Sequence, residues 1–559
     1  MSSSNSKVEN KKKFASFYTP QPVAQALADW AITDADTTVL DPSFGGCAFL
    51  YAALETLGRR GNPAPGKQIY GVDIDADAAF YIEPLFRAGA VPEQFITEDF
   101  FNITPDYFGN KLFGAVIGNP PYIRYHEIPE DAQQRAIDCL ETFNIKISGR
   151  ASYWAFFLLY SMQFLRPGGR LAMVLPGALL HTDYSAQVRE LLTKHFEQVT
   201  VYLLQERIFE GTDEESVLLC AAGARKPHKT LRIGTVKKVE ALEQAIKEMQ
   251  ASTRTFDNVY GDGGWLRALI EKETIALYDG LMENQNVIRM GKWVTTRIGV
   301  VTGNNEFFIL SKDEQEQRGI SDNYLKPIIR RASHLTGLWI RDENLQHIAT
   351  NGNKYLLLVL DQVESKLPKS LQEYIQYGQE IGISKSQKCR ARRHWYVVPH
   401  TFIPPAFMPC MVAAWPRLVI NQSQYTCTNN ILRLLWKEAR PGEDWIRLAL
   451  GTLSTLSQLS AELVGRSYGG GVLKLEPKEL ARLAVPLVPV EVSEELARKV
   501  DSLLRKNKAS EATDAVDSAL LNSDIGLNTT KVEHLRKARN QLFLRRRQHR
   551  RDAQGILSN

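Results

Sequence analysis

Apolar positions in the first 225 residues follow two alternating periods. Short runs of Val, Ile, Leu and Phe end at an acid, a Gly or an Asn, and longer stretches with apolar residues at helical spacing come between them. Strands are expected over 37–40, 68–72, 94–97, 112–117, 170–175, 199–204 and 216–221, and helices over 23–32, 47–57, 151–165 and 186–196. This alternation, closed by an adjacent strand pair, predicts a Rossmann-like α/β domain with a mostly parallel sheet and one antiparallel edge strand.

The rest of the chain has weaker and more varied periodicity. Amphipathic helical stretches dominate 226–290, short strands with Gly and Asn turns and many aromatics fill 291–490, and 491–559 has helical spacing with a basic end. We therefore expect five segments: a disordered basic arm over 1–13, the α/β domain over 14–225, a helical connector over 226–290, a mixed α/β domain over 291–490 and a helical basic extension over 491–559.

Composition limits the class of protein. A chain of 559 residues is too long for one core, and its hydrophobic and charged fractions, 44% and 23%, are those of an ordinary soluble protein. No apolar run reaches membrane-spanning length, and the N-terminus lacks the apolar core of a signal peptide. The six cysteines are scattered, without a CxxC pair or zinc-binding histidine spacing. We expect a cytoplasmic monomer with reduced thiols, no metal and no membrane partner.

Three expected strands end in acids at one edge of the sheet. Asp41 begins the turn DPSFGG after the first strand, Asp73 ends the second, and Asp99 with Phe100 follows the third. Ligands of open α/β sheets bind outside the carboxyl ends of the strands. A loop that starts with an acid favours a ligand with a positive charge over a pyrophosphate, and Asp73 is placed to bind ribose hydroxyls. Each acid alone could instead be a helix cap.

The stretch LFGAVIGNPPY delivers Asn119, Pro120, Pro121 and Tyr122 to the end of an apolar strand. The two prolines lack backbone donors, so their carbonyls are free to accept. An Asn side-chain oxygen beside a rigid Pro carbonyl suits one amino group, and Tyr122 offers a flat face for a planar base. The alternative is an ordinary proline turn with Asn as its cap.

Three further segments carry candidate contacts. The polar stretch QERIFEGTDEE over 205–215 is expected to expose Phe209, for which local packing is the alternative explanation. The block KCRARRHWY interleaves Arg390, Arg392 and Arg393 with aromatics, which suits phosphate and base contacts or else a solvated face. The basic run at 545–551 is expected either to touch DNA backbone or to fray.

These motifs resemble those of the adenine-specific DNA methyltransferases in which cofactor motifs precede the catalytic motif and a target-recognition domain comes last. DPSFGG, GVDID, EDFF and GNPPYI occur in that family's order, and TGNNEFF and GGGVLKL are similar to segments of attached specificity domains. One departure is Cys47, which stands where many members have glycine.

The resemblance implies S-adenosylmethionine as cofactor, double-stranded DNA as substrate and a flipped target adenine. The implied site residues are Thr19, Asp41 and Ser43 for the methionine end, Asp73 for the ribose, Asp99 and Phe100 for the adenine ring of the cofactor, the catalytic NPPY residues 119–122, and Phe209 against the other face of the target base. A solitary modification enzyme is expected, with a separately encoded restriction endonuclease as partner.

Two other functions stay open. A protein glutamine methyltransferase would present a side-chain amide to the same NPPY loop, but a peptide substrate would not require the aromatic, Arg-rich C-terminal half. A non-catalytic DNA-binding subunit would need neither the intact NPPY motif nor acids at Asp41, Asp73 and Asp99.

Overall fold

The computed structural model describes residues 19–147, 151–206, 208–209, 215–226, 230–252, 255–257, 262–343, 346, 348, 353–468 and 471–555. The chain divides into two compact units. Unit 1 comprises Met1–Ile270, Tyr468–Gly471 and Leu544–Asn559, and unit 2 comprises Glu271–Ser467 and Val472–Phe543. In the described part of the chain, no helix is long and apolar enough to cross a membrane.

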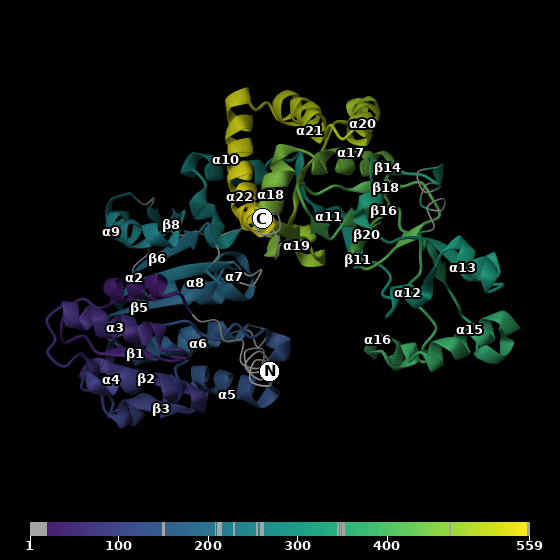
Figure 1. The fold of residues 1–559 in the computed structure, drawn as a ribbon. Coiled ribbons are helices and arrows are strands. Elements are labelled where there is room, and N and C mark those ends of the chain that lie inside the picture. The colour runs from purple at the N-terminus through teal and green to yellow at the C-terminus, as the bar shows by residue number, and fades with distance from the viewer. Residues whose placement is uncertain are drawn as a thin grey trace. The chain divides into compact units, whose positions relative to one another are not determined.

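Unit 1 is built on one large sheet, shown with its helices in Figure 1. Among the described residues it has nine strands in the order β3-β2-β1-β4-β5-β7-β6-β8-β9. The bounds are β1 Val39–Asp41, β2 Ile69–Asp73, β3 Phe95–Thr97, β4 Phe113–Gly118, β5 Leu165–Pro176, β6 Phe196–Leu204, β7 Ser216–Ala224, β8 Thr230–Val236 and β9 Thr255–Asp257. The first five strands in this order run parallel, which confirms the expected α/β class.

Two expectations about this sheet are wrong. The antiparallel strand β7 lies inside the sheet, between β5 and β6, because β8 pairs in parallel with the outer side of β6 and β9 pairs with β8. The segment 226–290 is therefore not a purely helical connector, since it supplies β8 and β9 to this sheet and also contains β10 (Val287–Arg289). The alternation of buried Leu231 and Ile233 in β8 is a strand pattern, but the neighbouring helix α9 (Leu242–Ser252) dominates the periodicity of the segment.

Helices cover the sheet of unit 1. Helices α2 (Gln21–Ala31) and α3 (Ala48–Arg59) pack on one another, and α5 (Glu130–Glu141) packs on α6 (Tyr153–Ser161). Every residue of α6 is buried, as expected for a helix with the sequence YWAFFLLYS, which is apolar on all sides. Helices α4 (Glu83–Arg87), α7 (Ala178–His181) and α8 (Tyr184–His195) complete this set.

Unit 2 contains smaller sheets and a helical end. Its five-stranded sheet has the order β11-β20-β16-β18-β14, and its four-stranded sheet has the order β12-β15-β13-β19, counted over the described residues. Their strands are β11 Val294–Ile298, β20 Ile431–Trp436, β16 Ala406–Pro409, β18 Val419–Asn421, β14 Trp339–Ile340, β12 Ile309–Leu310, β15 Leu356–Leu358, β13 Leu325–Ile329 and β19 Thr426–Cys427. The mixed α/β character expected for 291–490 is confirmed.

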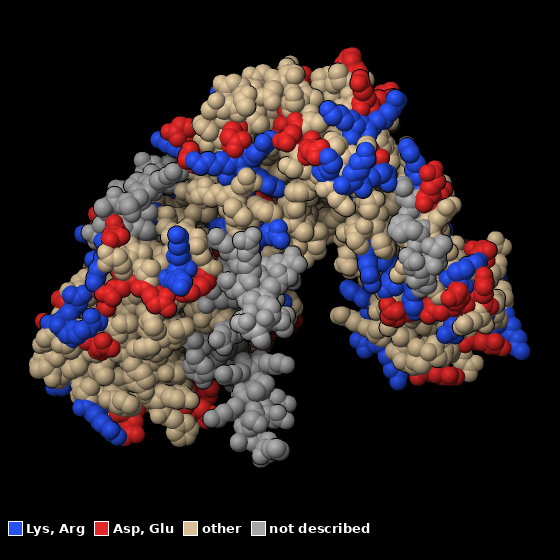
Figure 2. Space-filling view, turned by 45° about the horizontal axis from the view of Figure 1, so that its top comes forward, with Lys and Arg blue, Asp and Glu red and all other residues tan. Residues whose placement is uncertain are grey.

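Short strand pairs and helices complete unit 2. The remaining strands are β10 Val287–Arg289, β17 Met411–Val412, β21 Arg466–Tyr468, β22 Val472–Lys474 and β23 Ala484–Pro486. Its helices are α10 Lys272–Met282, α11 Met290–Trp293, α12 Asn305–Phe308, α13 Lys312–Gln317, α15 Lys369–Glu380, α16 Gln387–Arg390, α17 Glu443–Thr452, α18 Thr455–Val464, α19 Pro477–Arg482, α20 Val490–Arg505, α21 Ala509–Asp517 and α22 Thr529–Gly555, the last reaching into unit 1. On the face seen in Figure 2, basic and acidic side chains intersperse.

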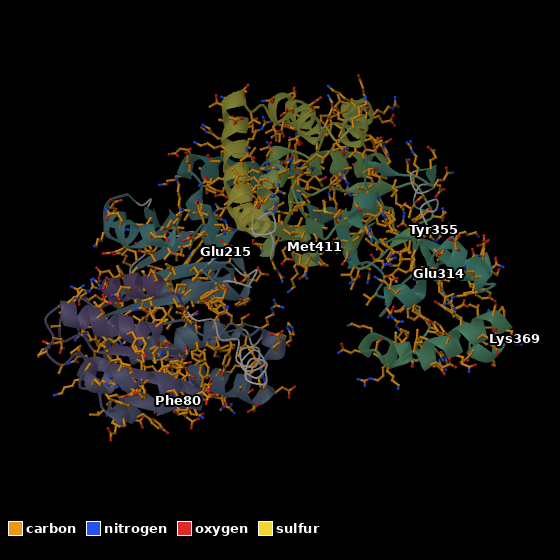
Figure 3. The ribbon with its side chains drawn as sticks, viewed as in Figure 1. Phe80, Glu215, Glu314, Tyr355, Lys369 and Met411 are labelled. Atoms are coloured by element: carbon orange, nitrogen blue, oxygen red, sulfur yellow. The ribbon has the colours of Figure 1, made fainter. Side chains whose placement is uncertain are left out.

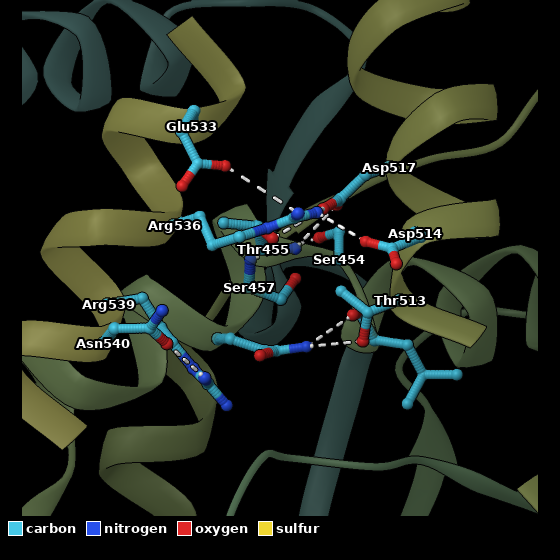
Figure 4. Close-up of polar contacts among 12 residues, drawn as sticks. Ser454, Thr455, Ser457, Thr513, Asp514, Asp517, Glu533, Arg536, Arg539 and Asn540 are labelled. Atoms are coloured by element: carbon cyan, nitrogen blue, oxygen red, sulfur yellow. Dashed lines mark hydrogen bonds and ion pairs between the residues drawn. The ribbon is translucent and has the colours of Figure 1, made fainter. Parts of the chain in front are cut away.

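A polar network centred on the buried Asp517 joins the helical end of unit 2 to its core (Figure 4). The carboxylate of Asp517 accepts hydrogen bonds from the backbone N–H of Thr455 at 2.8 Å and from its hydroxyl at 2.5 Å. The guanidinium of Arg536 in α22 lies 3.2 Å from the same carboxylate and 2.7 Å from that of Asp514. This network fixes α21 and α22 against the start of α18, so the helical character expected for 491–559 belongs to packed helices.

Candidate active site

The carboxyl ends of β1, β2 and β4 meet at one edge of the sheet in unit 1. Parallel pairing aligns Leu40 with Tyr70 and with Val116, so the loops that follow the three strands emerge together. The hydroxyl of Ser43 donates to the backbone carbonyl of Asn119 at 3.2 Å. The structure thus brings the glycine turn and the NPPY segment into direct contact.

Asp41 is a buried acid at the end of β1. Its Oδ1 accepts the backbone N–H of Ser43 at 3.0 Å, and a Cβ added at Gly118 would lie 2.8 Å from the same oxygen. Burial raises the pKa of the Asp41 carboxyl well above its ordinary value, the Ser43 N–H opposes this shift, and the nearby Asp73 carboxylate adds to it. A cation bound beside Asp41 would offset the cost of ionising it.

Asp73 connects the end of β2 to the glycine turn. Its Oδ2 accepts the N–H of Gly45 at 2.7 Å and its Oδ1 the N–H of Asp75 at 2.8 Å, and burial raises its pKa although both hydrogen bonds lower it. Gly45 adopts a φ of +45°, which L side chains rarely adopt. Asp73 therefore shapes the turn, and its predicted contact with ribose hydroxyls stays a prediction.

Ile74 was missed by the sequence analysis. It follows Asp73 directly and is 59% exposed, so it presents an apolar surface beside the acid. The signal in the sequence is the apolar residue between the two acids of GVDID.

Asp99, Phe100 and Thr19 are all buried. Asp99 accepts the N–H of Phe101 at 3.1 Å, and its other oxygen lies 3.3 Å from the guanidinium of Arg135 in α5, a partner that sequence analysis missed. The ring of Phe100 packs among aromatic rings of α6 and the turn after it, with centroid distances of 5.4 Å to Phe157, 5.1 Å to Tyr160 and 5.2 Å to Phe164. Packing against these rings accounts for the burial of Phe100. Its contact with the adenine ring of the cofactor stays a prediction, and so does the contact of Thr19 with the methionine end.

Cys47 occupies a left-handed backbone conformation. Its φ is +63°, at the residue that precedes α3, and its side chain is fully buried. Glycine adopts this conformation at no steric cost, which explains the glycine of the resembled family at this position. Burial raises the pKa of the Cys47 thiol, and the carboxylates of Asp41 and Asp73 raise it further.

The NPPY segment follows β4, all of whose residues are buried. The ring of Tyr122 meets that of Phe209 edge to face, with centroids 6.5 Å apart and planes at 81°. The structure therefore brings together two side chains that are far apart in the sequence and that were both predicted to contact the target base. Phe209 was expected to be exposed, and this is wrong: it is only 6% exposed, with the ring of Tyr122 against it.

The arginine block of unit 2 divides into buried and exposed members. Arg392 donates to the backbone carbonyls of Val301 and Thr302, both at 2.8 Å, and to that of Trp395 at 3.2 Å, and burial lowers its pKa. These bonds tie the TGNN turn to α16 and give Arg392 a structural task, whereas Arg390 and Arg393 are exposed. DNA contacts by these arginines stay a prediction.

A hollow of about 720 Å³ lies beside this block. It is lined by both exposed arginines together with Glu364, Gln372, His394 and Trp395. The indole N–H of Trp395 is buried and has no hydrogen-bond partner among the described residues. Guanidinium, amide and indole groups around one hollow can bind phosphates and planar bases.

The basic end of α22 is not a frayed tail at Arg545 and Arg546. Arg545 pairs with Glu215, and Arg546 is buried and donates to the carbonyl of Gly471. Within the described residues, no group of three or more His, Cys, Asp and Glu side chains is arranged to hold a metal ion.

Comparison with known families accounts for both halves of the chain. Residues 4–259 match the N-6 DNA Methylase family, and residues 262–521 match the C-terminal domain of the type II methyltransferase M.Eco57I. The chain belongs to the N6 DNA methyltransferases of restriction–modification type.

Full-length relatives agree with this assignment. The chain is 23% identical to the type II methyltransferase M.AccI of Acinetobacter calcoaceticus, over 88% of this chain and 89% of that protein. It is 22% identical to the type II methyltransferase M.XamI of Xanthomonas campestris pv. amaranthicola, over 84% of each chain. The solved structure of the Type IIL restriction-modification enzyme MmeI in complex with DNA has a TM-score of 0.57 at 13% identity, over 93% of this chain and 75% of that chain, and so shares the fold.

Proposed function

We propose that this protein transfers a methyl group from S-adenosylmethionine to the exocyclic N6 of an adenine flipped out of a specific duplex DNA sequence. The observation that carries the proposal is the hydrogen bond from Ser43 to the Asn119 carbonyl. It joins the turn predicted to hold the cofactor to the loop predicted to hold the base, so that donor and acceptor sites share one edge of the sheet.

The residues at this edge fit the cofactor. Asp41 is a buried carboxyl and Asp73 a partly buried one, and both have raised pKa values, which suits a ligand that brings an ammonium group and hydroxyl donors. The exposed Ile74 offers an apolar face for a purine ring. When bound, S-adenosylmethionine supplies an electrophilic methyl group on a positively charged sulfur.

The NPPY segment suits the amino group of adenine. Its nitrogen is a poor nucleophile because its lone pair is delocalised into the ring. The Asn119 side-chain oxygen and the Pro120 carbonyl would accept its two hydrogens, orient the lone pair and stabilise the positive charge that develops on the nitrogen. The proton is then released through these acceptors to water.

The aromatic pair suits a base taken out of the duplex. Tyr122 and Phe209 stand edge to face, so one ring has to turn before a base can stack between them. Stacking on such a ring is worth about 1–3 kcal/mol per base, enough to offset part of the cost of unstacking the adenine.

The hollow beside Arg390 and Arg393 supports double-stranded DNA as the substrate, because both guanidinium groups are exposed next to Trp395. The names of the relatives, both type II methyltransferases, support a modification enzyme, and a separately encoded restriction endonuclease as its partner stays a prediction. The cytoplasmic location and the monomeric state stay predictions.

The test is a methylation assay with a radiolabelled cofactor. The purified protein is incubated with labelled S-adenosylmethionine and either duplex DNA or a protein lysate, and the DNA is digested to nucleosides. We expect label in N6-methyldeoxyadenosine. Label in protein glutamine would establish the alternative methyltransferase, and no transfer despite DNA binding would establish a non-catalytic subunit. Sequencing that detects methylated bases in host DNA would then give the recognition sequence.

A further inference from the structure

Two consecutive arginines of α22 lie within unit 1 with most of their side chains out of solvent, Arg546 buried and Arg545 partly buried. The side chain of Arg545 is 12% exposed and pairs with the carboxylate of Glu215, whose side chain is 11% exposed. Arg546 is 2% exposed and donates to the carbonyl of Gly471. An arginine whose task was to attract phosphates would keep its guanidinium in water, so these two have another role.

The end of α22 is seated closely on Gly471. This glycine has a φ of +71°, and a Cβ added to it would lie 2.6 Å from the carbonyl oxygen of Arg546 and 3.0 Å from the Cα of Arg547. A side chain at this position would push the helix away. The glycine therefore permits a backbone contact that holds Arg545 at Glu215.

Glu215 lies where β5 and β7 meet, and Figure 3 labels it. Its backbone carbonyl accepts the N–H of Gly177 at 2.6 Å, and a Cβ added to Gly177 would lie 2.9 Å from its Oε2. The next residue, Ser216, pairs with Pro176 at the end of β5. Strand β5 also pairs with β4, whose last residue, Gly118, immediately precedes Asn119. The ion pair thus lies at the strand ends beside the NPPY segment.

We propose that Arg545 is a positioning residue for methyl transfer. By pairing with Glu215 it fixes the end of β5 and the start of β7 beside the NPPY segment. Removing one partner of a buried ion pair leaves the other charge uncompensated, so the loss of either side chain loosens this edge. The inference rests on the proposed function in that methyl transfer is the reaction being positioned.

The first test does not depend on activity. Hydrogen exchange is measured at the amide of Gly177 and over residues 216–218 in the full-length wild type, in Arg545→Gln and in Arg547→Gln. Arg547 lies on the same helix and is exposed. Its Gln variant therefore serves as a control that removes the same charge. We expect faster exchange in Arg545→Gln and wild-type exchange in Arg547→Gln. Equal exchange in all three proteins would overturn the proposal.

The second test separates positioning from DNA attraction. Arg545→Gln should lower kcat on duplex DNA by about 10- to 100-fold, as misplaced reacting groups do, with the Kd for the cofactor within about twofold of wild type. Glu215→Gln should lower kcat similarly, and the reversed pair Arg545→Glu with Glu215→Arg should recover part of it. With 2-aminopurine at the target position, both single variants should also change the fluorescence on binding.

One outcome would overturn the inference, and another would overturn only the proposed function. If Arg545 instead attracts phosphates, its variant raises KM for DNA and flattens the salt dependence, while Glu215→Gln leaves kcat intact or improves DNA binding. If the wild type methylates no DNA, the proposed function fails, and the exchange experiment still decides whether Arg545 fixes this edge. A single variant that does not fold is replaced by the reversed pair, which keeps both charges.

Discussion

Replacing Asp41 by Asn is expected to change stability and cofactor affinity in opposite directions. Because burial raises the pKa of this carboxyl, the fold favours its protonated form. Its contribution to stability is therefore present below the ordinary pKa and is lost as the pH rises through the raised one. At higher pH the ionised group destabilises the ligand-free protein. Asn has the same shape, carries no charge and can still accept the Ser43 N–H.

The expected magnitudes follow from the interactions that the substitution removes from the ligand-bound and from the ligand-free protein. The proposed hydrogen bond between the Asp41 carboxylate and the ammonium group of the cofactor would be worth about 1.5–3 kcal/mol, so the Kd of the Asn variant should be about 10- to 150-fold weaker. The ligand-free variant loses no such bond and no longer has to bury a charge. Each 1 kcal/mol gained raises Tm by about 2–4 °C for a domain of this size.

Two measurements over a pH series test this reasoning. Calorimetric titration with S-adenosylmethionine should show that the affinity of the wild type rises with pH through the raised pKa, whereas the affinity of Asp41→Asn stays flat and low. Thermal unfolding without ligand should show a higher Tm for Asp41→Asn at alkaline pH and equal values at acidic pH. A variant that melts below wild type at alkaline pH and keeps its Kd would refute the argument, and Asp41 would then serve only the Ser43 turn.

Four further outcomes are expected. Asn119→Ala should lose far more in kcat than in DNA affinity, and near-normal turnover would leave the proline-turn interpretation of NPPY. Tyr122→Ala should keep some activity and Tyr122→Phe most of it, because only the ring face is needed; equal loss in both would contradict stacking. Arg392→Ala should lower Tm, since three carbonyls lose their donors, whereas Arg393→Ala should weaken DNA binding and reduce its salt slope by about one; the reverse result would exchange their roles. Cys47→Gly should be more stable than Cys47→Ala by about 1 kcal/mol in denaturant unfolding, because alanine is strained at this φ; the opposite order would rule out backbone strain there.

The parallel part of the sheet could be predicted because its signal is local. Each of β1, β2 and β4 joins an apolar run to a polar or glycine end within a few residues, so both the strand and the edge that carries the site follow from the pattern. The order of strands beyond β5 could not be predicted in the same way. The interior position of β7 depends on β8 adding to the sheet, which a helical stretch next to β8 concealed.

Contacts between segments that are far apart in the sequence limit how well the roles of side chains can be predicted. Arg392 and the carbonyl of Thr302 are 90 positions apart, and Arg545 and Glu215 are 330 positions apart. From composition, such arginines are expected to be basic and exposed. Only the fold shows that their guanidinium groups already donate to backbone carbonyls or pair with a carboxylate. The exposure of Phe209 was misjudged for the same reason, since the ring that it contacts, Tyr122, follows a different strand.

The buried thiol of Cys47 has a consequence for the chemical reactivity of the turn over 41–47, which is proposed to hold the cofactor. Maleimides, iodoacetamide and peroxides react with thiolates, and burial together with two neighbouring carboxylates raises the pKa of this thiol. At physiological pH the sulfur therefore stays protonated and shielded. A turn that carries cysteine where glycine would have sufficed has gained no site for alkylation or oxidation, and the protein should keep its cofactor affinity when handled without a reducing agent.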